Sequence, residues 1–405
     1  MTSLNKFKPL LLRHSAIFWL LGLYIVNIYT LYFLSLTSFK KSILRDKLII
    51  VLIFILFIQV VSLMIGPIFH DYYTISRTFA MIHNIVVYSF LFAGYNLAKQ
   101  ANISLKNAFP KFLMSFILLV ITTFVISTYL KHELSYGGLL SFISDNKYTT
   151  VSFNRMGWTW LGTSPRSEVF GIYSNSTALL LFLTYVISAF YTRIRKRISI
   201  LVLICLFTIG SRSMLFFGVI TVLIYHIKSK HLYLLFVFMM PLFILAIVNL
   251  IPVLSEMRQG SNDTRMAIYT ESLRLTLDTN FILGLGIKPI LPGIVSFQYP
   301  VGSHSTLLGY FIKNGMIGGA LVLTLYVSAF YFSLRYFANT FFKSVYKYNH
   351  RDFFLVSSFL CLLIISLAED LDSYEPIMLF VGILLYNFKK ALFSHKKHSV
   401  EHYKQ

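Results

Sequence analysis

Charged residues are scarce in this sequence. Only 13% of its 405 residues are charged, against about 25% in ordinary soluble domains. Apolar and aromatic residues account for 57%, and a soluble fold of this size cannot bury that much apolar surface. The composition therefore excludes a soluble enzyme, a disordered protein and a fibrous protein.

Cysteine and acidic residues are also few. The two cysteines, Cys205 and Cys361, lie inside apolar runs and form neither a CxxC pair nor a disulfide framework, so nothing supports a metal or redox site built on them. The chain has 15 acidic against 36 basic residues and a formal net charge of +21. Cytoplasmic loops of membrane proteins carry an excess of lysine and arginine, and no basic stripe lies on a soluble segment here. We therefore expect no nucleic-acid partner.

Long apolar runs dominate the sequence instead. They lie near residues 15–36, 48–68, 78–97, 112–130, 169–191, 198–227, 232–250, 315–337, 353–368 and 376–388. The run at 15–36 is too long for the apolar region of a signal peptide and is interpreted as one membrane span. We predict an all-α, polytopic membrane helical bundle of about 11 (roughly 10–12) transmembrane helices, which forms a single integral membrane domain over residues 1–405.

The run at 198–227 decides the topology, because a polar segment at 210–213 interrupts it. If the run crosses the membrane once, the dense basic loops that follow it lie outside. If it crosses twice, these loops lie in the cytoplasm, as is usual for short basic loops. We therefore predict two short helices, with Arg212 at the outer face and the C-terminus inside. The same scheme places the N-terminus outside, which is unfavourable for the basic residues there.

Two outer segments are too long to be simple turns, and long ordered connections are usually functional. The first is the loop at 131–168. The second, at 251–314, is predicted to be a large outer catalytic loop with short surface helices. Within it, residues 261–263 (SND) can cap a helix that runs to about residue 278. The apolar face of this helix suits a position on the membrane surface and comprises Met266, Tyr269, Leu273 and Leu277.

Arg212 and Arg265 are the leading candidates for anion binding. A charge near membrane depth is costly, so Arg212 is interpreted as functional, with an arginine that merely anchors a helix end as the alternative. Arg265 is expected in the first turn of the surface helix, where free backbone N–H groups and the helix dipole favour a phosphate. A guanidinium there adds a bidentate contact. A solvated loop arginine is the alternative.

His304 lies among glycine and small hydroxyl residues, in the first turn of a helix that Ser303 is predicted to cap. Small neighbours allow the close approach of a bulky ligand, and His304 could accept a proton from a sugar hydroxyl. A structural or exposed histidine is the alternative. Arg166 and Glu168 end the first outer loop, where they either face a polar ligand or pair with each other.

Acidic residues cluster between the last two apolar runs, as Glu369, Asp370, Asp372 and Glu375. Neither histidine nor cysteine accompanies them. A solvated turn is therefore favoured over a divalent-metal site built from carboxylates. We expect no metal and no cofactor.

In their order and spacing, these motifs resemble the O-antigen polymerase and O-antigen ligase superfamily of bacterial envelope proteins. The resemblance is carried by residues 209–213 (IGSRS), 261–265 (SNDTR), 281–286 (FILGLG), 302–308 (GSHSTLL) and 313–318 (KNGMIG). Upstream, residues 166–175 are similar to an arginine-to-asparagine stretch of the family, with Glu168 in place of a small residue. Ser305 stands where asparagine is common, a variant associated with capsule and exopolysaccharide polymerases.

The resemblance implies metal-independent glycosyl transfer from an undecaprenyl-diphosphate-linked oligosaccharide, at the outer face of the cell inner (cytoplasmic) membrane. It implies that Arg212 and Arg265 contact the diphosphate. His304 would be the base for the acceptor hydroxyl or a third diphosphate contact. The substrate-binding candidates are Arg166, Glu168, Ser211 and Ser303. The implied partners are the lipid bilayer, a chain-length regulator and the flippase of the same pathway.

Polymerase and ligase share these residues, so the motifs do not separate the two activities. A polymerase joins repeat units, whereas a ligase moves a finished glycan to another acceptor. The composition is rich in lysine, isoleucine, phenylalanine, tyrosine and asparagine, as an AT-rich genome would give, and this favours an exopolysaccharide or capsule polymerase. A lipid-linked oligosaccharide flippase is the alternative of another class. It would need polar residues along a path at the membrane midplane, whereas the candidates cluster at the outer ends of spans.

Overall fold

The computed structural model describes residues 4–21, 23–37, 45–100, 102–130, 134–137, 150–156, 166–169, 174–227, 259–290, 300, 305–341 and 349–402. The helices are α1 (Leu4–Leu20), α2 (Tyr24–Thr37), α3 (Lys47–Phe69), α4 (Ile75–Gln100), α5 (Asn102–Leu130), α6 (Ser174–Tyr191), α7 (Lys196–Ile209), α8 (Arg212–His226), α10 (Gln259–Thr279), α11 (Thr306–Phe341), α12 (His350–Ala368) and α13 (Glu375–His402). A short 3₁₀ helix, η2 (Leu371–Ser373), joins α12 to α13.

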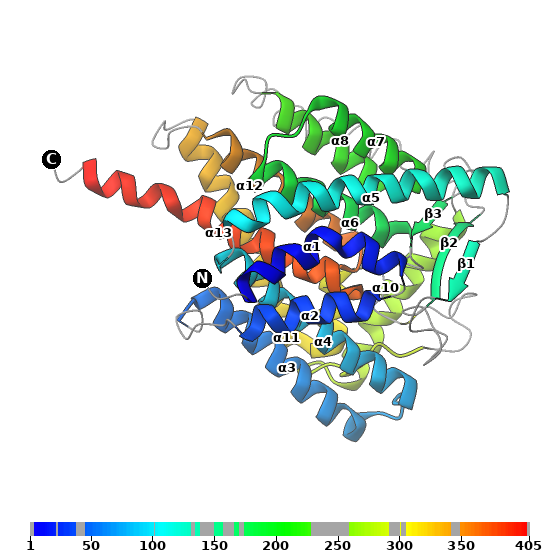
Figure 1. Ribbon diagram of the computed structural model, residues 1–405. Helices are drawn as coiled ribbons and strands as arrows, with labels where there is room; N and C mark the ends of the chain where they lie inside the picture. Colours follow the sequence, from blue (N-terminus) through cyan, green and yellow to red (C-terminus); the bar gives the residue numbers. More distant parts are fainter. Residues whose placement is uncertain are drawn as a thin grey trace.

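The predicted helical membrane bundle is confirmed. Among the described residues, 6 helices are long and apolar enough to cross a membrane: α3, α4, α5, α11, α12 and α13. Shorter apolar helices, α2, α6 and α8, lie beside them (Figure 1). Both chain termini lie at one end of the bundle. We call this the inner end and the opposite one the outer end, following the predicted topology.

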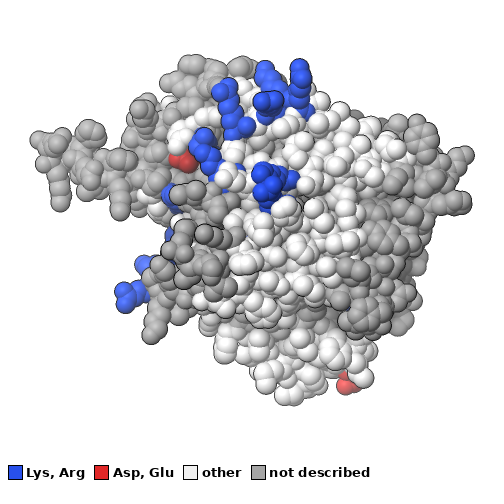
Figure 2. Space-filling view, in the orientation of Figure 1, with Lys and Arg blue, Asp and Glu red and all other residues white. Residues whose placement is uncertain are grey.

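Basic side chains follow this polarity. Figure 2 shows lysine and arginine gathered toward the inner end, while most of the remaining described surface in that view is uncharged. An uncharged belt of this kind suits contact with lipid, and an inner end rich in lysine and arginine suits the cytoplasmic side of a membrane.

The apolar run at 15–36 is not a single span, and this corrects the sequence-based prediction. The helix α1 ends at Leu20 and α2 starts at Tyr24, and the two run antiparallel (Figure 1). The side chain of Asn27 links them, because its amide donates to Leu11 O (3.2 Å) and its Oδ1 accepts from Trp19 Nε1 (3.2 Å).

This hairpin returns the N-terminus to the same end of the bundle as the C-terminus, whereas the predicted topology placed the two termini on opposite sides. Lys8 is buried there, and its ammonium group donates to Gln100 Oε1 at the inner end of α4 (3.4 Å). The basic residues of α1 thus lie on the side that favours positive charge.

The run at 198–227 forms two short helices, as predicted. Gly210 ends α7 in the left-handed conformation (φ 80°), and its N–H donates to Phe207 O (3.0 Å). At the inner end of the pair, Ser199 Oγ lies 2.8 Å from His226 Nε2. The chain therefore turns back at Ser211, and Arg212 begins α8 at the outer end.

The segment at 131–168 contains a small sheet that the sequence analysis did not predict. Its strands β1 (Leu134–Gly137), β2 (Thr150–Met156) and β3 (Arg166–Val169) pair antiparallel in that order. They lie at the outer end of the bundle (Figure 1). In β2, Val151 and Phe153 alternate with polar residues, which is the period-two pattern typical of a half-buried strand.

The core of the bundle is centred on α4 and α13, which pack closely. A Cβ atom added to Gly382 of α13 would lie only 2.9 Å from Tyr95 N of α4. Small residues of this kind let two helix backbones approach, as is common inside membranes. The ring of Phe380 on α13 then packs edge-on against Phe109 of α5 (centroids 5.1 Å apart).

We predict that a cysteine in place of Asp278, on exposed α10, reacts with a membrane-impermeant thiol reagent in intact cells. A cysteine in place of Arg351, at the inner start of α12, is expected to react only after the cells are broken. Cys205 and Cys361 are both buried, so they should contribute no background. The reverse labelling pattern, read on a gel, would show that the bundle is inserted the other way round.

Candidate functional site

The turn between α7 and α8 presents polar groups at the outer end. Ser211 holds the N-cap position of α8, yet its hydroxyl makes no capping bond. This hydroxyl is buried (1% exposed) and has no hydrogen-bond partner among the described residues. Arg212 follows as the first residue of α8 and is partly exposed. A helix start with free N–H groups, a hydroxyl without a partner and a guanidinium can together bind an anion.

The helix α10 confirms that a helix forms in this loop, but it begins earlier than expected. It starts at Gln259, so residues 261–263 lie inside it and do not cap it. Arg265 consequently lies in the second turn, not in the first as predicted. Its backbone is described, but its side chain lies outside the described part of the structure.

The exposed face of α10 carries Leu273 and Leu277 of the predicted apolar stripe, beside the charged Arg274 and Asp278. Ile268 and Leu275 are buried, and Leu275 packs with Leu285 and Ile312. The opposite face leaves Leu277 57% exposed. A helix on the membrane surface would bury such a stripe in the lipid interface.

The helix α11 begins at Thr306, two residues after His304. The hydroxyl of Ser305 accepts from Leu308 N (3.3 Å) and so acts as the cap. The predicted cap at Ser303, with His304 in the first turn, is therefore wrong. Ser303 and His304 themselves lie outside the described residues.

Two glycine-containing motifs form one backbone clasp. The segment at 281–286 lies against a break in α11 at Gly315 (φ 59°), where Leu285 N donates to Ile312 O (2.7 Å) and Gly286 N to Lys313 O (2.9 Å). A Cβ atom on Gly284, which has a φ of 73°, would lie 2.5 Å from Ile312 O. Only glycine permits both this approach and this backbone angle.

The clasp also binds the turn between α3 and α4. The carbonyl of Leu285 accepts from Tyr73 Oη (3.0 Å) and lies 2.9 Å from His70 Nε2. Burial lowers the pKa of His70, and it outweighs the opposing effects of the Leu285 carbonyl and Asp71. A neutral imidazole with its proton on Nε2 can donate to that carbonyl.

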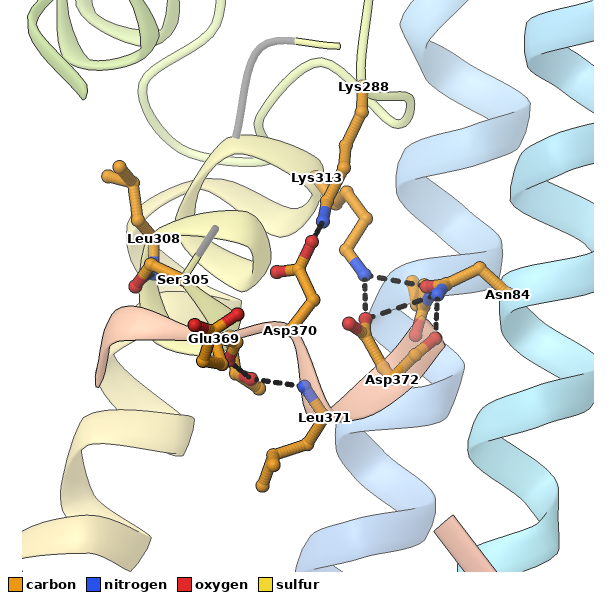
Figure 3. A network of polar contacts seen from close by, with 11 residues as sticks. Asn84, Lys288, Ser305, Leu308, Lys313, Glu369, Asp370, Leu371 and Asp372 are labelled. Atoms are coloured by element: carbon orange, nitrogen blue, oxygen red, sulfur yellow. Dashed lines mark hydrogen bonds and ion pairs between the residues drawn. The ribbon is translucent and has the colours of Figure 1, made fainter. Parts of the chain in front are cut away.

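A buried ion pair lies at the centre of the outer end (Figure 3). Lys313 and Asp372 are 1% and 3% exposed, and Nζ lies 2.6 Å from Oδ2. Asn84 of α4 joins both, because its Oδ1 accepts from Lys313 (2.6 Å) and its Nδ2 donates to Asp372 Oδ2 (3.1 Å). Burial alone would raise the pKa of Asp372, but the ammonium groups of Lys313 and Lys288 outweigh it and hold this pKa well below its usual range.

The other acidic residues of 369–375 are also paired, so the predicted solvated turn is wrong. Asp370 accepts from Lys288 (3.2 Å), and Glu369 accepts from Asn175 of α6 (3.0 Å). Glu375 is 1% exposed and lies 3.0 Å from His83 of α4. Each carboxylate therefore connects the loop to a different part of the bundle.

This network holds the start of α11. Thr306 Oγ1 donates to Glu369 O (2.9 Å) and accepts from Leu371 N (2.8 Å). These two hydrogen bonds fix the start of α11 against the loop before α13. The sequence analysis missed Lys313 as an organising residue. Its charge at the edge of an apolar run was the signal that could have found it.

The comparisons with known proteins identify one part of the chain. Residues 197–323 match the family model described as O-Antigen ligase. The match runs from α7 through α10 to α11 and confirms the resemblance read from the motifs. No curated protein matches the chain. The matched region includes Arg212, Arg265 and His304, although the structure describes only the first of these side chains.

We predict that replacing Lys313 by Met strongly lowers the thermal unfolding midpoint of the purified protein. The change leaves the Asp372 carboxylate buried without its cation, a loss that typically costs about 3–5 kcal/mol. A second substitution in the same chain, Asp372→Leu, should restore part of the midpoint, because it removes the uncompensated charge.

Arg274→Ala is the matched control, because its ion pairs with Glu271 and Asp278 lie on the exposed face of α10. This variant should keep the wild-type midpoint. Equal midpoints for Lys313→Met and the wild type would contradict a central role for the buried pair.

Proposed function

We propose that this chain, a member of the O-antigen ligase and polymerase superfamily, polymerises undecaprenyl-diphosphate-linked oligosaccharide repeat units into a surface polysaccharide. The reaction takes place at the outer face of the cytoplasmic membrane. The observation that carries the proposal is the family match over residues 197–323, which contains all three candidate catalytic residues. The outer position of the α7–α8 turn supports it.

In this reaction, the bond between the anomeric carbon of the growing glycan and the diphosphate breaks. A new bond forms from that carbon to a hydroxyl of the acceptor repeat unit. Negative charge develops on the departing diphosphate, and fixed cations lower the barrier. Arg212 and Arg265 are assigned to this charge, because a guanidinium matches phosphate oxygens in a bidentate geometry and stays charged.

The turn before α8 supplies further donors. The buried hydroxyl of Ser211 and the first N–H groups of α8 can complete the contacts of Arg212 to a phosphate oxygen. His304 is assigned to the acceptor hydroxyl, whose proton it accepts, or to a third contact with the diphosphate. Ser303 adjoins it and is assigned to substrate binding.

Arg166 and Glu168 are assigned to the sugars. They are two residues apart on β3. Their strand pairs with β2, with Glu168 opposite Asn154 and Arg166 opposite Met156. The sheet lies at the outer end, where the glycan part of the substrate extends away from the membrane.

Ligation is the second candidate function, and the name of the matched family, O-Antigen ligase, favours it. A ligase would move a finished glycan from the diphosphate to a different acceptor with the same arginines. Incubation of the purified protein with lipid-linked repeat units alone separates the two. A ladder of longer glycans supports the polymerase, whereas transfer that requires an added second acceptor supports the ligase.

We predict that Arg212→Ala and Arg265→Ala each abolish long polysaccharide, while the protein reaches the membrane in normal amount. Loss of one buried charge-assisted contact costs about 2–4 kcal/mol, or roughly 30- to 1000-fold in rate. A lysine at either position keeps the positive charge but cannot make the bidentate contact of a guanidinium with phosphate, so little polymer should remain. Polymer length on a gel, beside a blot for the protein, is the measurement.

Arg274→Ala is the control here too, because Arg274 lies on the same helix as Arg265 but pairs with Glu271 on the exposed face. Its polymer should match the wild type. Full-length polymer from both Arg212→Ala and Arg265→Ala would refute the assignment of the arginines to the diphosphate.

We predict that the transfer continues in excess chelator. The arginines supply the positive charge, and the acidic residues of 369–375 are engaged by Lys288, Lys313, His83 and Asn175. Elongation of lipid-linked repeat units by the purified protein in EDTA is the measurement. Activity that disappears in EDTA and returns with magnesium would instead indicate a metal held by carboxylates.

A further inference from the structure

A long cavity lies inside the bundle, apart from the residues assigned to glycosyl transfer. It has a volume of about 780 Å³ and is bounded by α3, α4, α11, α12 and α13. Most of its wall is aliphatic or aromatic, for example Leu52, Val322, Phe359 and Val381. Cavities of this size and lining are typical of small-molecule and lipid sites.

The cavity runs along most of the bundle. On α13 its wall extends from Met378 to Phe393, which at 1.5 Å per residue is about 22 Å. The hydrocarbon core of a bilayer is about 30 Å thick. Near the outer end the wall is formed by Thr306, Tyr310 and Leu371. The space therefore suits an extended apolar chain that lies roughly parallel to the helices.

The inner end of the cavity is positively charged. Its lining includes Arg45, Lys47, Lys99 and Lys389 but one acidic residue, Asp46. Asp46 is already engaged, because it forms an ion pair with Lys389 and accepts from Leu48 N (3.1 Å). Arg45, Lys47 and Lys99 are exposed, and no ion pair joins them to another described residue. These three residues give the inner opening of the apolar cavity a net positive charge.

The lining of the outer part of the cavity is uncharged. Among the described lining residues, none of those near Thr306, Tyr310 and Leu371 is cationic. A ligand with an anionic head group would therefore orient this group toward the inner end. This orientation differs from that of the proposed diphosphate donor, whose head group lies at the outer face.

We propose that this cavity binds an anionic phospholipid of the inner leaflet. Its phosphate head group contacts Arg45, Lys47 and Lys99, and an acyl chain extends between α3, α11 and α13 toward Tyr310. Basic residues close to the membrane surface attract anionic lipids through their charge. The apolar wall of the cavity contacts the acyl chain of the lipid. The chain end packs beneath Thr306 and Leu371, which hold the start of α11.

The test uses phosphatidylglycerol with brominated acyl chains, titrated into the full-length protein in detergent. A Phe332→Trp substitution places a fluorescent reporter in the cavity wall, and bromine quenches it on contact. Its signal is the difference from the same titration of the wild-type protein, which has three tryptophans of its own. Phosphatidylcholine with the same chains is the neutral comparison. We expect phosphatidylglycerol to bind much more tightly. Combined Arg45→Gln, Lys47→Gln and Lys99→Gln should weaken it about a hundredfold, or about fivefold for each residue, without changing phosphatidylcholine binding.

Two further variants make the result specific. Combined Lys196→Gln, Arg197→Gln and Arg351→Gln removes the same charge from the inner end outside the cavity, and it should leave binding unchanged. Ala329→Phe narrows the cavity without adding a second fluorophore, and in the Phe332→Trp protein it should abolish the quenching by both lipids. Equal binding of the two lipids, or equal loss in the control variant, would overturn the proposal. Displacement of phosphatidylglycerol by undecaprenyl phosphate, with an affinity that the Gln variants do not change, would overturn it in favour of a polyprenyl chain.

Discussion

The buried ion pair between Lys313 and Asp372 is the interaction on which the outer end of this protein depends. Two charges inside a membrane bundle are stable only when they are paired and hydrogen-bonded. Asn84 supplies a further hydrogen bond to each of them, since it accepts from Lys313 and donates to Asp372. The pair connects α4, α11 and the loop before α13. Around it, the contact of Thr306 with Glu369 and the clasp at Gly284 hold the start of α11. The part of α11 that lies in the matched family region is therefore held in place by these contacts.

The two ends of the bundle serve different purposes because their charges differ. At the inner end, exposed lysine and arginine face the polar surface of the membrane, where Lys8 and the cavity mouth also lie. At the outer end, among the described residues, Lys288 and Lys313 are paired with acidic residues, Arg274 is paired on the exposed face of α10, and Arg212 lies at the start of α8. Charge at the inner end suits orientation and lipid contact, and charge at the outer end suits a specific anionic substrate.

Much of the fold could be predicted from the sequence, because apolar runs and basic loops report directly on a bilayer. The α7–α8 hairpin followed from the position of Arg212 and the charge on later loops. The break between Leu20 and Tyr24 did not, since hydropathy does not register a turn inside an apolar run. The site was predicted only as a set of residues. The structure places Ser211 and Arg212 at the turn between α7 and α8. The positions of the Arg265 and His304 side chains in the site stay predictions.

What the sequence by itself determined is the class of protein, the helical membrane bundle and the resemblance to the O-antigen ligase and polymerase superfamily, because these depend on composition and on the order of short motifs. Only the tertiary structure decided the partners of the polar residues. The acidic residues from Glu369 to Glu375 read as a solvated turn in the sequence, yet they bind Asn175, Lys288, Lys313 and His83 from distant segments. The physical reason is that the cost of burying a charge depends on its neighbours in space, and those neighbours are set by the packing of the whole bundle.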